Sequence, residues 1–144
     1  MSESDFQFGQ VLLIDDSEID ILVNRRLIEL TRFASNVTVT SSGEEAMHYL
    51  REECASSQHA PDWIFLDMHL PMMSGYDFIE EFKTLPSFIK DKTKIIILSV
   101  FQKQERLQKL FENDFVAGQL EKPLIQQSLK DLKEKKFFKS SVSF

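Results

Sequence analysis

The chain has 144 residues, of which 42% are hydrophobic, so it is long enough to bury the core of one ordinary domain and too short for two. A net charge of -6 argues against a nucleic-acid-binding surface, and a single cysteine, Cys54, excludes an internal disulfide bond. The N-terminus lacks the basic start and the apolar segment of a signal peptide, and no apolar run approaches the length that spans a membrane. We therefore expect a cytoplasmic protein that binds neither nucleic acid nor membrane.

Strand and helix patterns alternate along the chain. Short runs of apolar or β-branched residues indicate strands, and apolar residues that recur every three or four positions indicate helices, three of which follow a capping-box pair. In chain order, these patterns predict a strand at residues 11–14, a helix from 17 to 30, a strand at 37–40, a helix from 42 to 54, a strand at 63–67, a helix from 74 to about 86, a strand at 95–98, a helix from 103 to 112, a strand at 115–120 and a helix from 124 to 136. The segment 87–93 is expected to be a loop. This alternation implies an α/β fold whose parallel sheet is covered by helices on both faces.

The third predicted strand, Trp63–Asp67, is the most informative stretch of the chain. Its apolar residues leave no position to face water, which is typical of a parallel strand that is buried on both faces. The strand ends in Asp67, and a carboxylate there needs a hydrogen bond, a cation or solvent to offset its desolvation. Taken alone, Asp67 could equally cap a turn.

The predicted sheet brings several polar residues to one edge, because parallel strands all end on the same side, where open α/β sheets bind ligands. The residues at the strand ends are Asp15, Asp16, Asp67, Ser99 and Lys122. Each has an ordinary alternative role, as a helix cap or an exposed turn residue, but five such coincidences at one edge are improbable. The glycine-rich phosphate loops of the two common nucleotide-binding folds are absent from the sequence.

These side chains suit phosphoryl transfer. Three converging carboxylates repel one another by about 4 kcal/mol per pair at about 4 Å and a dielectric constant of about 20, so they require a cation. Ligands that are oxygen atoms only suit a hard divalent ion such as Mg²⁺. With Lys122, such an ion would offset the charge of phosphoryl oxygens, while an aspartate serves as the nucleophile and Ser99 donates its hydroxyl.

Four motifs now carry a resemblance to a known family. They are Leu-Leu-Ile-Asp-Asp at 12–16, Phe-Leu-Asp-Met-His-Leu-Pro-Met-Met-Ser-Gly at 65–75, Ile-Leu-Ser at 97–99 and Glu-Lys-Pro at 121–123. Together they resemble the receiver domain of two-component response regulators. The resemblance covers residues 10–136, which leaves an N-terminal extension at 1–9 and a tail at 137–144. It implies a flavodoxin-like (βα)5 doubly wound sheet with strand order 2-1-3-4-5.

The resemblance also implies a phosphorylation site with a metal ion. Asp67 would accept a phosphoryl group from a sensor histidine kinase or a histidine phosphotransfer protein. The cofactor would be Mg²⁺, held by Asp15, Asp16, Asp67 and the backbone carbonyl of His69. The imidazole of His69 has no part in this role.

Further residues match the family's switch positions. The conserved hydroxyl maps to Ser99, the phosphate-binding lysine to Lys122, and the peptide bond before Pro123 would be cis, as in the family. Two positions depart from the family pattern: Gln119 replaces an aromatic residue that often serves as a switch, and Val100 is bulkier than usual. A bulkier residue after Ser99 is expected to narrow access for small phosphodonors.

Residues 137–144 are too short for an output domain. We therefore expect a stand-alone response regulator that changes its affinity for an unknown downstream protein, through the surface of the fourth helix, fifth strand and fifth helix. It would not be an enzyme beyond Mg²⁺-dependent self-phosphorylation and slow self-dephosphorylation at Asp67.

A phosphorylation-independent interaction module of the same fold is the alternative. A hydrolase of the haloacid dehalogenase type would need a second aspartate where His69 stands. The oligomeric state stays open.

Overall fold

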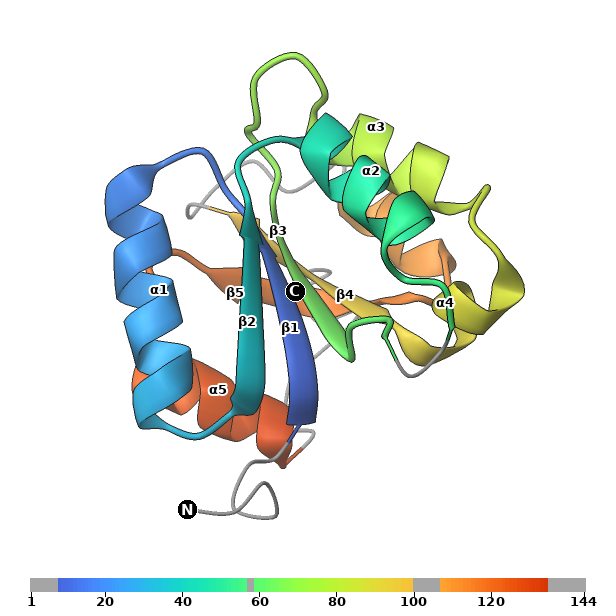
Figure 1. The fold of residues 1–144 in the computed structure, drawn as a ribbon. Coiled ribbons are helices and arrows are strands. Elements are labelled where there is room, and N and C mark those ends of the chain that lie inside the picture. The colour runs from blue at the N-terminus through green and yellow to red at the C-terminus, as the bar shows by residue number, and fades with distance from the viewer. Residues whose placement is uncertain (1–7, 57–58, 100–106, 135–144) are drawn as a thin grey trace.

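A parallel five-stranded sheet forms the centre of the molecule. The computed structural model describes residues 8–56, 59–99 and 107–134. The strands are β1 (Phe8–Ile14), β2 (Ala34–Thr40), β3 (Trp63–Asp67), β4 (Lys94–Ser99) and β5 (Val116–Glu121). All neighbouring strands are parallel, in the order β2-β1-β3-β4-β5 (Figure 1). The predicted fold and strand order are therefore confirmed.

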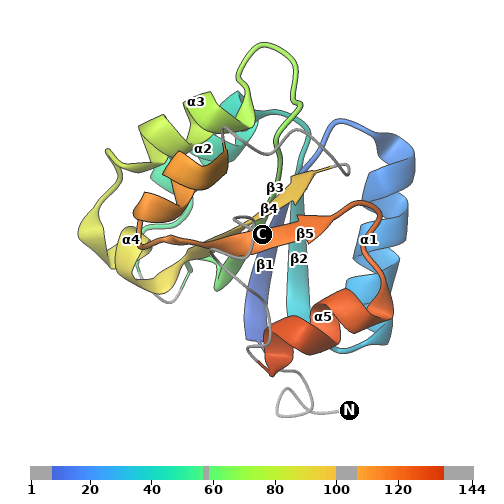
Figure 2. The same ribbon diagram turned by 180° about the vertical axis from the view of Figure 1, so that it is seen from behind.

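Helices cover both faces of this sheet. They are α1 (Glu18–Leu30), α2 (Gly43–Glu52), α3 (Gly75–Phe82), α4 (Ser87–Lys92) and α5 (Gln126–Lys133), with a 3-10 helix, η2, at Leu107–Glu112. Helices α1 and α5 lie on one face, and α2, α3 and α4 lie on the other (Figures 1 and 2). Within the described residues, no helix combines the length and apolar character that crossing a bilayer would require.

Two apolar layers hold the helices to the sheet. Alternate residues of β1 divide between the layers: Leu12 and Ile14 pack with α2 and α3, whereas Val11 and Leu13 pack toward α1 and α5. Every residue of β3 is buried, as predicted for a strand covered on both faces. Packing on both faces thus fixes the positions of the strands and of the residues at their ends.

Helix α4 lies in the segment predicted to be a loop, and that prediction is wrong. The helix has six residues, and the Pro86 carbonyl accepts the N–H groups of Ile89 and Lys90 at its start. Only Ile89 is buried in it, so a single apolar residue ties the helix to the core. One such residue cannot produce a helical repeat in the sequence.

The other element boundaries differ from the predictions by a few residues. Strand β1 begins at Phe8, because the Asp62 carboxylate accepts the N–H groups of Gly9 and Gln10, each at 3.0 Å. Of the predicted fourth helix, residues 107–112 form η2, while 103–106 lie outside the described residues. The first seven residues and the predicted tail, 137–144, also lie outside them.

The apolar residues that predict α1 mostly face water. Ile19, Leu22, Val23 and Leu30 are 73%, 67%, 45% and 67% exposed. Their spacing places them on one side of the helix, and we call these four residues the α1 stripe. The side that packs on the sheet carries the buried Asn24 and Ile28. The helical period is therefore correct, but most of the apolar face points away from the core.

Candidate functional site

Polar side chains from four strand ends meet at the carboxyl edge of the sheet. Asp15 follows β1, Asp67 is the last residue of β3, Ser99 is the last residue of β4, and Lys122 follows β5. Asp15, Asp67 and Ser99 are only 2%, 3% and 6% exposed. The edge therefore gathers buried acceptors and a hydroxyl beside one lysine, as the sequence predicts.

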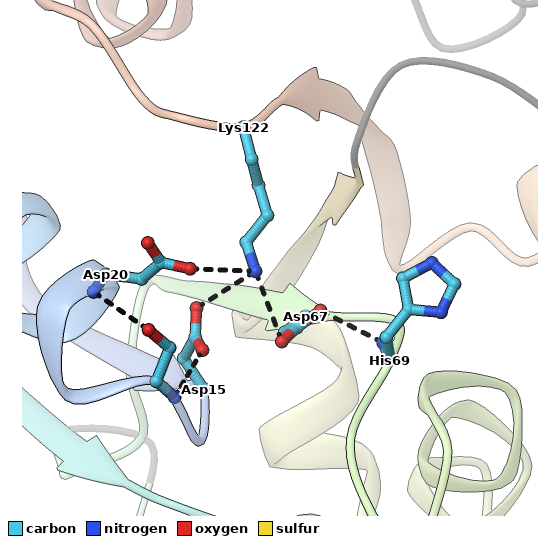
Figure 3. Close-up of polar contacts among 6 residues, drawn as sticks. Asp15, Asp20, Asp67, His69 and Lys122 are labelled. Carbon is cyan, nitrogen blue, oxygen red and sulfur yellow. Dashed lines mark hydrogen bonds and ion pairs between the residues drawn. The ribbon is translucent and has the colours of Figure 1, made fainter.

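The ammonium group of Lys122 lies at the centre of the carboxylates. Its Nζ atom is 3.2 Å from Asp67 Oδ2, 3.4 Å from Asp15 Oδ2 and 3.3 Å from Asp20 Oδ2 (Figure 3). The Lys122 side chain is 15% exposed, so water screens these contacts less than it screens surface ion pairs. One cation thus joins carboxylates from β3, from the β1 end and from the first turn of α1.

Backbone N–H groups fix the orientation of the two buried carboxylates. Ser17 N–H donates to Asp15 Oδ1 at 2.9 Å, and His69 N–H donates to Asp67 Oδ1 at 3.0 Å. In both cases, the other oxygen of the same carboxylate faces Lys122. The His69 side chain is exposed, so its backbone makes the contact that matters here.

Burial and charge act in opposite directions on these groups. Burial, with a contribution from the charge of Asp67, raises the pKa of Asp15 above its ordinary value, although the Ser17 hydrogen bond and the Lys122 ammonium lower it. Burial lowers the pKa of Lys122, but the negative charges of Asp67 and Asp15, together with the contacts to Asp67 and Asp20, hold this pKa above its ordinary value. Lys122 is therefore a cation at neutral pH.

The three predicted metal ligands lie close together. One carboxylate oxygen from each of Asp15, Asp16 and Asp67 falls within 4.8 Å of the others. Asp16 is exposed, so the group opens to solvent on that side. Among the described residues, none donates a hydrogen bond to the buried Asp15 Oδ2. Its contact with the Lys122 ammonium, at 3.4 Å, is a long ion pair. An oxygen-only group with such a loosely paired buried acceptor fits a hard divalent cation. The role of the His69 carbonyl stays a prediction.

Ser99 is held from β5. Its hydroxyl oxygen accepts a hydrogen bond from Gln119 Nε2 at 3.0 Å, and its carbonyl accepts the N–H of Lys122 at 2.9 Å. The peptide bond between Lys122 and Pro123 is cis. Gln119 stands where the family often has an aromatic residue, and it contacts the predicted phosphate-binding hydroxyl directly. Val100 lies outside the described residues.

Sequence reasoning did not identify Asp20 as a site residue. Ser17 and Asp20 have the spacing of a capping box, and the Ser17 hydroxyl accepts the Asp20 N–H at 3.2 Å. The Asp20 carboxylate, however, contacts Lys122. Its place in the first helical turn after Asp15 and Asp16 was the available signal, because that turn begins at the same edge of the sheet. The same pattern in α3 gives both bonds of the box, between Ser74 and Asp77.

Known proteins are similar to this chain in sequence and in fold. The family model described as "Response regulator receiver domain" matches residues 11–134. The two-component response regulator ORR13 of Oryza sativa subsp. japonica is 32% identical over 104 residues, which are 71% of this chain and 77% of that protein. ORR1 of the same plant is 25% identical over 123 residues, and the match spans about half of its length, 52%.

A solved structure agrees with these matches. The two-component response regulator from Cytophaga hutchinsonii superposes with a TM-score of 0.79 at 30% identity, covering 88% of this chain and 95% of that one. The sequence matches, the fold and the carboxylates at the sheet edge all indicate the same family. This chain belongs to the family of response regulator receiver domains.

Proposed function

We propose that this protein accepts a phosphoryl group on Asp67 from a histidine kinase or a histidine phosphotransfer protein. The added charge then changes its affinity for a downstream protein. The observation that carries this proposal is the Lys122 ammonium, 3.2 Å from the Asp67 carboxylate and close to two further carboxylates. A cation at that distance offsets the charge that phosphoryl oxygens bring to the site.

The transfer is a displacement at phosphorus. A carboxylate oxygen of Asp67 attacks the phosphorus of a donor phosphohistidine, the new O–P bond forms, and the N–P bond breaks. The freed imidazole nitrogen of the donor takes up a proton from water. The His69 N–H holds Asp67 Oδ1 during the attack, while Lys122 faces Oδ2. The chain thereby supplies the nucleophile, its orientation and one positive charge.

Receiver domains generally bind Mg²⁺ at an acidic cluster, and we assign that ion to Asp15, Asp16 and Asp67. The 4.8 Å grouping of their oxygens supports this assignment, and the His69 carbonyl is proposed as a further ligand. When bound, Mg²⁺ would neutralise part of the charge on the phosphoryl oxygens. Asp15 and Asp16 act on the reaction only by holding this ion. The protein is then a phosphoacceptor with slow self-dephosphorylation and does not turn over an external substrate.

The surface beside the site supports a protein as the phosphodonor. Ile19, Leu22 and Val23 of the α1 stripe are exposed on the helix whose Asp20 contacts Lys122. Exposed apolar side chains that cluster on one surface mark protein-binding sites. A donor that brings a phosphohistidine to Asp67 has to cover the neighbouring surface. We therefore propose that the donor contacts this part of α1.

Intact mass measurement tests the phosphorylation directly. The chain is incubated with acetyl phosphate or phosphoramidate, with and without Mg²⁺, and then with phosphorylated histidine kinases. We expect the mass of one phosphoryl group to be added only when Mg²⁺ is present, and not in Asp67→Asn. The matched control is Asp131→Asn, which removes a carboxylate on α5 that accepts a hydrogen bond from Gln127. Failure with every donor would overturn the proposal and favour a phosphorylation-independent interaction module.

A further inference from the structure

The side chain of Gln119 connects β5 to the hydroxyl of Ser99. Gln119 lies beside Ile97 in the parallel register of β4 and β5, and Ser99 lies two residues further along β4. Gln119 Nε2 is 3.0 Å from Ser99 Oγ, and both side chains are at least partly buried. Because β4 and β5 also pair through their backbones, this side-chain bond joins two elements that are already fixed.

The direction of this hydrogen bond decides what the hydroxyl can do next. A serine hydroxyl has one hydrogen to donate and two lone pairs that accept, whereas a carboxamide nitrogen only donates. The Gln119 N–H therefore occupies a lone pair of Ser99 Oγ. It leaves the hydroxyl hydrogen available for another acceptor and excludes the orientation in which that hydrogen points at the Gln119 nitrogen.

Ser99 lies close to the proposed phosphoacceptor in the sheet. Asp67 is directly opposite Leu98 in the register of β3 and β4, so Ser99 is the next residue along the neighbouring strand. Ser99 also accepts the backbone N–H of Lys122, whose ammonium contacts the Asp67 carboxylate. Ser99 thus lies at the edge of the sheet where a phosphoryl group on Asp67 would lie.

We propose that Gln119 is a positioning residue that orients the Ser99 hydroxyl so that its hydrogen is donated to a phosphoryl oxygen on Asp67. This inference rests on the proposed function. A phenylalanine side chain at position 119 could not donate such a bond. The protein therefore orients its phosphate-binding hydroxyl through a polar contact from β5 that is already present before phosphorylation.

A reversal of the hydrogen bond gives the sharpest test. Gln119→Glu places a carboxylate, which only accepts, at nearly the same size, so it would take the Ser99 hydrogen for itself. Gln119→Leu removes the donor but takes no hydrogen. We expect Gln119→Glu to slow phosphorylation of Asp67 by phosphoramidate about tenfold, which is the same loss that we expect for Ser99→Ala, and Gln119→Leu to slow it about two- to threefold. A Gln119→Glu variant that keeps the native rate would overturn the inference.

A double-mutant cycle separates positioning from the effect of an added charge. In a Ser99→Ala background there is no hydroxyl to orient, so Gln119→Glu and Gln119→Leu should cause no further loss. An equal loss in both backgrounds would mean that the substitutions act through charge or packing, and the inference would be wrong. If the native chain accepts no phosphoryl group at all, the proposed function fails and this inference fails with it. If the native chain accepts it without coupling in the cycle, only the inference fails.

A readout without phosphate tests the hydrogen bond by itself. The side-chain amide resonances of Gln119 in a ¹⁵N-labelled chain should shift in Ser99→Ala, because the acceptor of the Nε2 hydrogen is lost. The resonances of Gln127, which donates to Asp131 at 2.8 Å, serve as the internal control and should stay unchanged. Unchanged Gln119 resonances in Ser99→Ala would overturn the inference independently of any phosphorylation assay.

Discussion

Lys122 Nζ lies 3.2 Å from Asp67 Oδ2, although the strand that precedes Lys122 is not a neighbour of the strand that ends in Asp67. The lysine side chain reaches past β4 to meet the carboxylate. The same ammonium contacts Asp15 at 3.4 Å and Asp20 at 3.3 Å. The Lys122 ammonium therefore neutralises part of the negative charge of an acidic site that is also suited to a metal ion.

Lys122→Met should have opposite effects on Mg²⁺ binding and on phosphorylation of Asp67. Removal of the ammonium leaves the carboxylates with excess negative charge, so we expect Mg²⁺ to bind about tenfold more tightly, equivalent to about 1.4 kcal/mol. Phosphorylation of Asp67 should nevertheless fall, because the phosphoryl oxygens lose a cation. Calorimetric titration with Mg²⁺ and intact mass measurement check the two effects. Lys130→Met, an exposed lysine on α5, is the matched control, and weaker Mg²⁺ binding by Lys122→Met would contradict this prediction.

Leu22→Ser should impair transfer from a protein donor selectively. Leu22 is 67% exposed in the α1 stripe, so its replacement leaves the core intact and removes apolar surface that a donor would cover. We expect about a tenfold slower transfer from a phosphorylated kinase and an unchanged rate with phosphoramidate. Phe88→Ser, a substitution of another exposed apolar residue, on α4, is the control. If Leu22→Ser slowed phosphorylation equally with the kinase and with phosphoramidate, the substitution would act on the phosphorylation site and not on donor binding.

Two glycines at equivalent helix starts should respond differently to alanine. A Cβ atom on Gly75 would meet the Met68 side chain and lie 2.9 Å from Met68 Cα, which is backbone next to Asp67. The three atoms nearest to a Cβ on Gly43 all belong to the Met73 side chain, and the closest is its sulfur, at 2.7 Å. Gly75→Ala should therefore lower the free energy of unfolding by about 1–3 kcal/mol, and Gly43→Ala should stay within about 1 kcal/mol of the native value.

Urea denaturation measures both glycine variants, and Mg²⁺ titration adds a functional readout. Movement of the Met68 backbone would displace the loop that carries the His69 N–H, so Gly75→Ala should also weaken Mg²⁺ binding. A Gly75→Ala variant with native stability and native Mg²⁺ affinity would show that this loop adapts without cost.

The thiol of Cys54 should make stability fall at alkaline pH. Burial raises the pKa of this thiol above its ordinary value of 9.0, and Glu53 adds to the rise, while a hydrogen bond with Tyr49 lowers it. The unfolded chain then loses the thiol proton at lower pH than the folded chain. The stabilisation is complete below about pH 9 and is lost as the pH rises through the folded-state pKa.

Comparison with Cys54→Ala isolates this effect from other groups that titrate in the same range. The difference in free energy of unfolding between the native chain and the variant should be constant from about pH 7 to about pH 8 and should shrink as the pH rises above about 9. Urea denaturation at each pH provides the two values. A difference that is constant with pH would mean that the thiol ionises equally in both states.

The sequence predicts which polar residues lie at the strand ends, because each belongs to a local pattern. A buried apolar run that stops at a carboxylate identifies Asp15 and Asp67, and parallel topology then brings them together. The contact of Asp20 with Lys122 follows no local pattern, since it depends on how far a lysine side chain reaches across the sheet. The bond between Gln119 and Ser99 likewise depends on the register of two strands.

The sides of the helices are harder to predict than the helices themselves. In α1 the apolar period is clear, yet Leu22 faces water while Asn24 is buried. The spacing of apolar residues can indicate a helix without indicating which side of the helix packs on the core. Exposed binding surfaces and buried cores carry the same apolar residue types. Helix α4 shows the opposite limit, since six residues with the single buried Ile89 give no repeat at all.

The strand order also has a consequence for biosynthesis. The ammonium that completes the acidic edge follows β5, almost a full domain length after Asp15. Contacts between such distant parts of a chain form late, because closure of the long intervening loop costs entropy before the contact can repay it. A nascent chain on the ribosome therefore exposes its aspartates long before it has the lysine that accompanies them. A chain whose last strand has not docked therefore lacks the ammonium that contacts Asp15 and Asp67.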